Sequence, residues 1–172
     1  FLFLSDRAAK LPTDPLSPDE KLQWARLSFN GIAVGLAKTA LLAVDRLYKM
    51  GYTDIIFVEG EDKLFPIVER YNNVETKVHY YKFNSIKQHR LTRNPDADDA
   101  SGMSASKMRM AAKEKDLTLF KRGLPSNFAR TKNAQDLFRN VRKGMMLTSS
   151  MDYTTLGAFK FKPFITASTK EE

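Results

Sequence analysis

Residues 104–109, Ser-Ala-Ser-Lys-Met-Arg, hold the densest group of side chains that could bind an anion. They open a predicted helix, whose first amides lack internal partners and carry partial positive charge, which favours phosphate. Ser104 and Ser106 add hydroxyl donors, and Arg109, three residues beyond Ser106, can turn its planar guanidinium to the same anion. Lys107 adds a point charge. The spacing predicts a phosphate site, and its alternative is a serine cap followed by a solvated basic helix.

A second candidate is the turn at residues 60–62, which directly follows the continuous apolar run 55–58. Gly60 allows the backbone to approach a ligand closely, and Asp62 can accept hydrogen bonds from a base, a ribose or a substrate. The alternative is ordinary local structure, with a turn glycine and with Asp62 as the N-cap of the next helix.

Composition limits the class of protein. The chain has 172 residues, of which 42% are hydrophobic and 28% charged, as in a single globular domain with an appendage. The absence of cysteine excludes disulfide scaffolds, cysteine zinc sites and thiol nucleophiles. No apolar run approaches the roughly 18–20 residues of a membrane span, so we expect no membrane partner and a cytoplasm-like compartment.

The charge is concentrated in one half of the chain. The formal net charge is +8, and residues 101–172 hold 14 basic and 6 acidic side chains. A basic half can attract nucleic acid, an anionic surface or phosphorylated small molecules. Nucleic acid is not the expected partner, because aromatic and basic residues alternate only near Phe159 and Phe161.

Metal-binding side chains are not grouped at ligand spacing. His79 falls in a predicted strand and His89 in a basic loop, with no second histidine near either. The acidic residues Asp96, Asp98 and Asp99 could recruit a divalent cation, but a solvated loop is the preferred interpretation. We therefore expect no metal held by protein side chains.

Hydrophobic periodicity predicts alternating strands and helices. Strands are expected at residues 1–4, 55–58 and 76–83, and helices at 17–29, 37–50, 64–71, 104–115, 116–120 and 134–143. The first part of this order is typical of a three-layer α/β fold with a mainly parallel sheet, in which ligands bind beyond the carboxyl ends of the strands. Residues 1–144 form this domain, and residues 145–172 are predicted to be an extended C-terminal arm that docks on a protein partner.

Three segments resemble motifs of the HxGH-type nucleotidyltransferases, the superfamily of adenylyl- and cytidylyltransferases. Residues 103–109 are similar to its I-S-G/S-T-x-x-R signature, and residues 58–63 to its strand-end V-x-G-S-D-R, with Glu61 for Ser and Lys63 for Arg. Residues 14–21 resemble the N-P-L-S-x-x-E-K stretch of phage-encoded members, and residues 94–98 with 102–109 are similar to those members too. The resemblance covers about residues 1–145, in order.

The resemblance implies a Rossmann-like fold and the transfer of a nucleoside monophosphate from ATP or CTP to a phosphorylated small molecule. Pyrophosphate would be released, with Mg²⁺ carried on the phosphates. The resemblance implies that the nucleotide is bound by Gly60, Asp62, Ser104, Ser106 and Arg109. It implies a catalytic role for Lys107 and Arg109, and binding of the acceptor phosphate by Lys21.

The family's first strand and its H-x-G-H histidines should precede a strand like residues 1–4, and they are not in this sequence. Neither His79 nor His89 has the Gly-His neighbour. One explanation is a C-terminal portion of a longer phage enzyme that acts in the host cytoplasm, which the non-Met start favours. The other is a catalytically inactive relative, a virion or assembly protein that binds through its basic arm at residues 145–172, with another chain filling the gap in the sheet.

Overall fold

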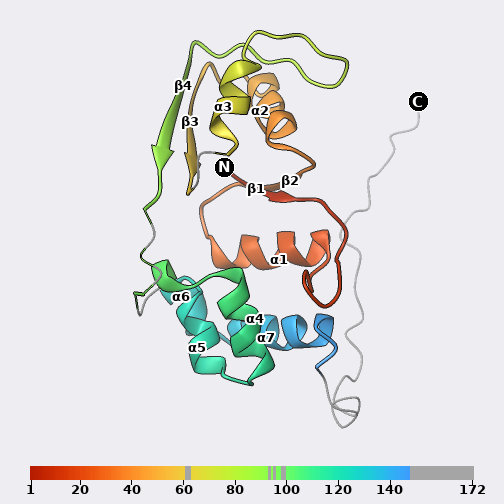
Figure 1. The fold of residues 1–172 in the computed structure, drawn as a ribbon, viewed down its shortest axis with the longest axis vertical. Helices are drawn as coiled ribbons and strands as arrows, with labels where there is room; N and C mark the ends of the chain where they lie inside the picture. The colour runs from red at the N-terminus through yellow and green to blue at the C-terminus, as the bar shows by residue number, and fades with distance from the viewer. Residues whose placement is uncertain (61–62, 93, 95, 98–99, 148–172) are drawn as a thin grey trace, which may run out of the picture.

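The computed structural model describes residues 1–147, apart from 61–62, 93, 95 and 98–99. Within these residues the protein is of mixed α/β type, with two short parallel sheets and seven α-helices (Figure 1). In chain order the elements are β1 (Leu2–Ser5), α1 (Pro18–Ser28), β2 (Val34–Ala37), α2 (Ala40–Lys49), β3 (Asp54–Glu59), α3 (Phe65–Arg70), β4 (Ser85–Arg90), the 3-10 helix η1 (Ala100–Gly102), α4 (Ala105–Lys113), α5 (Leu117–Arg122), α6 (Ser126–Ala129) and α7 (Lys132–Gly144). The predicted arm lies outside the described residues from position 148 onward.

The start of α1, the end of α2 and the start of α5 follow local capping chemistry, as the sequence predicts. Ser17 and Glu20 form both hydrogen bonds of a capping box at the start of α1. Gly51 follows the end of α2 with φ of +92°, a left-handed conformation that a side chain would strain. Asp116 caps α5 by accepting the amide of Leu119 at 2.8 Å.

Strand β2 was not predicted. Apolar periodicity predicts that a helix starts at Ala37, whereas residues 34–37 pair in parallel with β1 and α2 begins at Ala40. Four residues, Val-Gly-Leu-Ala, are too short to show a strand period and contain a glycine, which lowers strand propensity. The pairing with β1 is a tertiary contact, so periodicity along one segment does not reveal it.

The strand predicted at residues 76–83 is wrong, because this segment is a loop and the strand is β4, at Ser85–Arg90. His79 therefore lies in the loop and His89 in the strand. Side chains replace the missing strand ladder: the amide of Asn72 bonds both backbone groups of Phe83, at 3.0 and 2.9 Å. Aromatic burial, rather than strand pairing, explains the apolar pattern of this segment.

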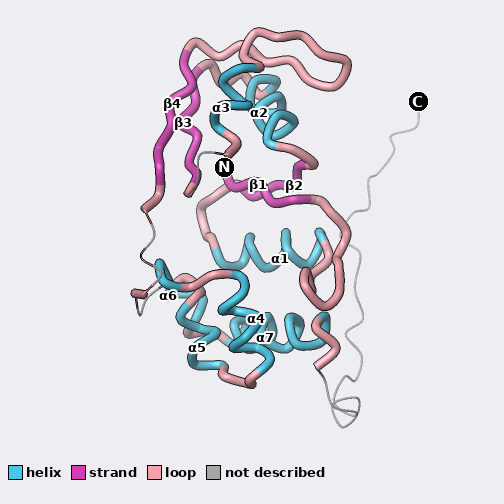
Figure 2. The backbone as a smooth tube through the Cα atoms, viewed as in Figure 1, coloured by secondary structure: helices cyan, strands magenta, loops and turns pink. Residues whose placement is uncertain are grey.

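The four strands do not form one sheet. In the part of the chain that the structure describes, β1 pairs only with β2, and β3 pairs only with β4 (Figure 2). The sequence predicts that β3 is covered on both faces, but Ile56 is 66% and Val58 54% exposed. Ile55 and Phe57, on the opposite face, pack against the cluster that α2 and α3 form. One face of β3 is thus open among the described residues.

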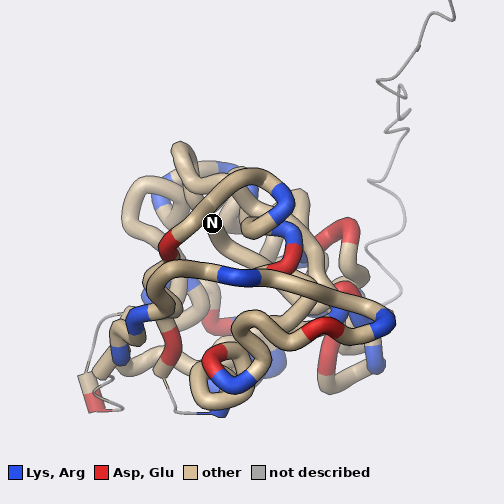
Figure 3. Tube along the Cα trace, turned by 90° about the horizontal axis from the view of Figure 1, so that it is seen from above, with Lys and Arg blue, Asp and Glu red and all other residues tan. Residues whose placement is uncertain are grey.

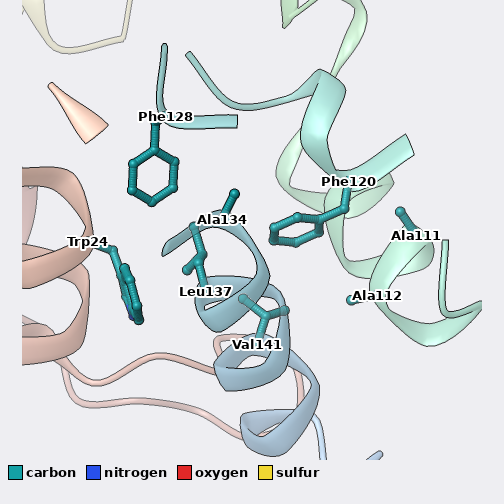
Figure 4. Packing of buried hydrophobic residues seen from close by; sticks show 8 residues of the cluster. All are labelled: Trp24, Ala111, Ala112, Phe120, Phe128, Ala134, Leu137 and Val141. Carbon is teal, nitrogen blue, oxygen red and sulfur yellow. The ribbon is translucent and has the colours of Figure 1, made fainter. Parts of the chain in front are cut away.

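Two hydrophobic clusters stabilise the two parts of the fold. The first lies under β3 and β4 and consists of Val44, Val68, Tyr81 and Phe83. The second lies among the C-terminal helices and α1 and consists of Trp24, Ala111, Ala112, Phe120, Phe128, Ala134, Leu137 and Val141 (Figure 4). Trp24 is the residue that α1 contributes to this cluster, so it joins the C-terminal helices to the β1–β2 sheet, which α1 contacts.

We expect Tyr81→Phe to destabilise the protein by about 1 kcal/mol at pH 8, because the carbonyl of Val68 loses the hydroxyl that donates to it at 2.7 Å. Burial, with a smaller contribution from Tyr71, raises the pKa of Tyr81 to about 12. The unfolded chain releases this proton near pH 10, so stability is lost as the pH rises from about 10 to 12.

Urea unfolding at pH 8 and pH 11 tests this expectation. The decrease in the free energy of unfolding between pH 8 and pH 11 should be smaller in Tyr81→Phe than in the wild type. Tyr80→Phe is the matched control, since the hydroxyl of Tyr80 bonds Asn73 at an exposed site. An identical pH dependence in the two variants would contradict the expectation.

Candidate functional site

A cavity of about 800 Å³ lies between β1 and β3. All residues of β1 and of β3 line it, and its floor is α2, which contributes Ala40, Ala43, Val44 and Leu47. The groups at the carboxyl ends of the strands are polar: they are Ser5, Arg7, Lys38, Thr39 and Glu59. The ends of β1 and β3, which the sequence analysis singled out, thus border one cavity with an apolar floor and a charged rim.

The N-terminus of α2 lies at this charged rim of the cavity. Thr39 caps the helix by accepting the amide of Leu42 at 3.2 Å. Arg7 and Lys38 are exposed, and no ion pair of either is seen among the described residues. Two cations beside the first turn of a ten-residue helix make this rim suited to a phosphate or carboxylate group.

A smaller cavity of about 360 Å³ adjoins the same strand ends and includes Asp6, Lys38, Asp45, Arg46 and Lys49. Most of the charged side chains around this smaller cavity form an ion pair with one another or a hydrogen bond with the backbone. Lys49 donates to Asp45 at 2.8 Å, and Arg46 donates to the carbonyl of Leu36 at 3.1 Å. Lys38 is thus the cation that the two cavities share.

Asp45 is a buried charge that is not among the residues predicted from the sequence. Burial favours its neutral form, but hydrogen bonds from Lys49 and from the amide of Tyr80 outweigh this and hold the pKa of Asp45 below its usual 3.8. The carboxylate ties α2 to the loop that precedes β4. The spacing of Asp45 and Lys49, four residues apart on one helix, is the sequence signal that could have found this pair.

The turn after β3 is only partly described. Glu59 accepts the amides of Leu64 and Phe65, each at 3.1 Å, and so holds the start of α3 in place of a cap. A side chain at Gly60 would meet only the carbonyl of Leu91, at 4.0 Å, so packing does not require glycine there. Asp62, the other nucleotide-binding candidate of this turn, lies outside the described residues.

At the start of α4, the structure brings Ser106 and Arg109 together. The guanidinium of Arg109 donates to the hydroxyl of Ser106 at 3.2 Å, at an exposed position. Ser104 is the N-cap and accepts the amide of Lys107 at 3.1 Å, while the ammonium of Lys107 donates to the carbonyl of Gly102 at 2.9 Å. Ser106 and Arg109 thus form the more accessible pair, and these four residues line neither of the two cavities.

Lys21 is already paired. Its ammonium donates to the carboxylate of Asp14 at 2.6 Å, and its side chain is only 19% exposed. To bind an acceptor phosphate, Lys21 would have to leave Asp14. The pair instead anchors the loop before α1 to that helix.

The described residues contain no group of three or more histidine, aspartate or glutamate side chains that could hold a metal ion. The carboxylate of Glu59 at the cavity rim is engaged by backbone amides and by Gln88. An ion carried on nucleotide phosphates needs no such group of side chains. In Figure 3 the positions of Lys and Arg and those of Asp and Glu are interspersed along the chain.

Comparison with known proteins gives no relative: the chain matches no protein-family model, no curated protein and no solved structure. No helix in the described part of the chain is both long and apolar enough to cross a membrane. The function is therefore inferred from the residues and their geometry.

Proposed function

We propose that the protein belongs to the Rossmann-like nucleotidyltransferases and binds the triphosphate of ATP or CTP at the start of α4. The observation that carries the proposal is the contact between Arg109 and Ser106, which places a guanidinium and a hydroxyl on one exposed helix turn. The first amides of this nine-residue helix add partial positive charge to the same place.

The carboxyl ends of β1, β2 and β3 support this proposal, because ligands of parallel α/β proteins bind beyond such ends. Arg7 and Lys38 provide two cations there that form no ion pair with another described residue, and Gly60 leaves open space where a nucleotide can approach the backbone. The ends of strands and the start of α4 would bind different parts of one ligand. The phage origin and the acceptor suggested by the sequence remain part of the same proposal.

In the proposed reaction, a phosphate oxygen of the acceptor attacks the α-phosphorus of the nucleotide. The bond between that phosphorus and the oxygen bridging to the β-phosphate breaks, and pyrophosphate leaves with the electron pair. Arg109 holds the β- and γ-phosphates and stabilises the negative charge that develops on them, with Lys107 as a second cation. Mg²⁺ bound to the phosphates supplies further charge neutralisation when it is present.

We expect Arg109→Ala to weaken the binding of ATP or CTP by about 1.5–3 kcal/mol, roughly 10- to 150-fold, because one charge-assisted contact is lost. Isothermal titration calorimetry measures the affinity. Arg139→Ala is the matched control: it removes the same charge from the surface of α7, where Arg139 pairs with Asp136 at 3.2 Å.

Two results would contradict the proposal. One is an equal affinity of the wild type, Arg109→Ala and Arg139→Ala for both nucleotides. The other is the absence of any nucleotide binding by the folded wild-type chain. Pyrophosphate release from ATP or CTP in the presence of nicotinamide mononucleotide or phosphopantetheine then tests the reaction and the acceptor.

A further inference from the structure

The turn between α1 and β2 contains the dipeptide Asn30-Gly31, which occurs once in the sequence. A hydrogen bond closes this turn, from the amide of Ile32 to the carbonyl of Phe29 at 3.2 Å. Gly31 has φ of +83°, a left-handed conformation that glycine adopts without steric cost. The backbone of the turn therefore favours glycine directly after Asn30.

Both residues of this dipeptide are exposed to solvent. A Cβ atom at Gly31 would have no neighbour within 4 Å, so the space beside its backbone is open. In the described part of the chain, the side chain of Asn30 and the amide of Gly31 have no hydrogen-bond partner. Water thus reaches both groups, and no protein contact fixes the carboxamide of Asn30 away from the next amide.

The other asparagines lack this combination. The carboxamide of Asn72 bonds both backbone groups of Phe83, and that of Asn73 accepts the hydroxyl of Tyr80. Asn94 precedes a proline, whose nitrogen carries no hydrogen. The remaining asparagines lie in α6, in α7 or directly before β4, and each is followed by a residue whose side chain crowds the next amide: Asn84, Asn127, Asn133 and Asn140.

An unshielded carboxamide beside a backbone nitrogen can react with it, because the two groups belong to neighbouring residues and ring closure is intramolecular. The nitrogen of Gly31 forms a bond to Cγ of Asn30, and the bond from Cγ to Nδ2 breaks. Ammonia leaves with the proton that the Gly31 amide loses, which passes through the solvent. Water then opens the resulting succinimide ring at either carbonyl, which leaves aspartate or isoaspartate at position 30.

We propose that Asn30 is a modification site, at which the folded chain forms a succinimide without an enzyme and converts to isoaspartate. In isoaspartate the main chain runs through the former side-chain carbons, so the connection from α1 to β2 becomes one atom longer. This connection spans residues 29–33, and the carbonyl of Ala33 accepts the amide of Leu2 at 2.9 Å beside the β1–β2 pairing. The new carboxylate also lies just beyond the C-terminus of α1, where the helix dipole disfavours negative charge.

This inference does not depend on the proposed function, and trypsin makes its test simple. Cleavage after Arg26 and Lys38 releases residues 27–38, in which Asn30 is the one asparagine, and cleavage after Lys82 and Lys87 releases residues 83–87 with Asn84. The full chain is incubated at pH 8 and compared with a sample digested at once. Mass spectrometry measures the fraction of each peptide whose amide has become an acid, and isoaspartyl methyltransferase identifies isoaspartate.

We expect Asn30 to convert roughly tenfold faster than Asn84, or more, because Ser85 carries a side chain and Gly31 does not. A synthetic peptide of residues 27–38 shows whether the fold permits the reaction. The rate in the folded chain should lie within tenfold of the rate in this peptide, since no contact shields the turn. A slower reaction in the folded chain, or equal conversion of Asn30 and Asn84, would overturn the proposal.

Asn30→Gln keeps a polar side chain in the turn but adds a methylene group, which disfavours closure of the ring. Labelling by the methyltransferase should be lost in this variant and kept in Asn84→Gln, the matched control. Labelling that survives in Asn30→Gln would place the reaction at another residue and contradict the assignment.

Urea unfolding measures the effect on the connection between α1 and β2. The isoaspartate form, separated by chromatography, should unfold at a lower urea concentration than Asn30→Asp, which carries the same charge without the extra main-chain atom. Equal midpoints would show that the longer connection does not disturb β2, and would overturn that part of the proposal.

Discussion

Replacing Trp24 with alanine is expected to lower the free energy of unfolding by about 3–5 kcal/mol, the range for truncating a large buried aromatic side chain. Trp24 is 8% exposed and packs in the cluster that includes Phe128, Ala134 and Leu137 (Figure 4). It is the contribution of α1 to that cluster. Its loss removes contact area between the C-terminal helices and the part of the fold that carries the sheets.

Urea unfolding followed by circular dichroism measures this change. Trp24→Phe should cost less than about 1.5 kcal/mol, because it keeps an aromatic ring and removes a buried indole N–H that has no hydrogen-bond partner among the described residues. Leu27→Ala is the surface control, since Leu27 lies on the same helix and is 46% exposed. If Trp24→Ala costs no more than Leu27→Ala, Trp24 does not join the two parts of the fold.

Gly144→Ala is expected to destabilise the protein by about 2–3 kcal/mol through overpacking. A Cβ atom at this position, the last residue of α7, would collide with the carbonyl oxygen of Pro15 and lie 2.8 Å from its carbonyl carbon. Both sides of this contact are backbone, so neither can rotate away. The chain would have to separate α7 from the loop that precedes α1.

Gly60→Ala provides the matched substitution for Gly144→Ala. The added Cβ atom at Gly60 meets only the carbonyl of Leu91, at 4.0 Å. We expect Gly60→Ala to change the free energy of unfolding by no more than an ordinary surface substitution does, about 0.5 kcal/mol. The midpoint of thermal unfolding, measured for both variants, reports the difference. Similar midpoints for the two variants would show that α7 and the loop at Pro15 are not in close contact.

Local chemistry explains which elements the sequence predicts well. The capping box of α1, the glycine after α2 and the aspartate before α5 act through groups within a few residues of each helix end. The serine cap and the contact between Ser106 and Arg109 likewise follow from positions three residues apart on one helix. These features depend on short-range geometry, which the order of residues determines directly.

The elements that were missed depend on distant partners. β2 exists because it pairs with β1, and the aromatic segment 76–83 is a loop because Asn72, Thr76 and Asp45 bond its backbone in place of a strand. An apolar alternation does not distinguish a strand in a sheet from a loop whose aromatic rings fill a core. The buried position of the Asp45 carboxylate depends on the same loop, whose Tyr80 amide donates to it.

By itself, the sequence determined the starts of α1, α4 and α5, the absence of cysteine chemistry and the spacing of the candidate phosphate-binding residues on α4. Only the tertiary structure decided that the strands separate into two sheets, that Lys21 is paired with Asp14, and that Ser5, Arg7 and Lys38 meet Glu59 at one cavity. The reason is physical: capping and helical spacing act between near neighbours in the chain, whereas strand partners, ion pairs and cavities arise from segments that only the folded chain brings together.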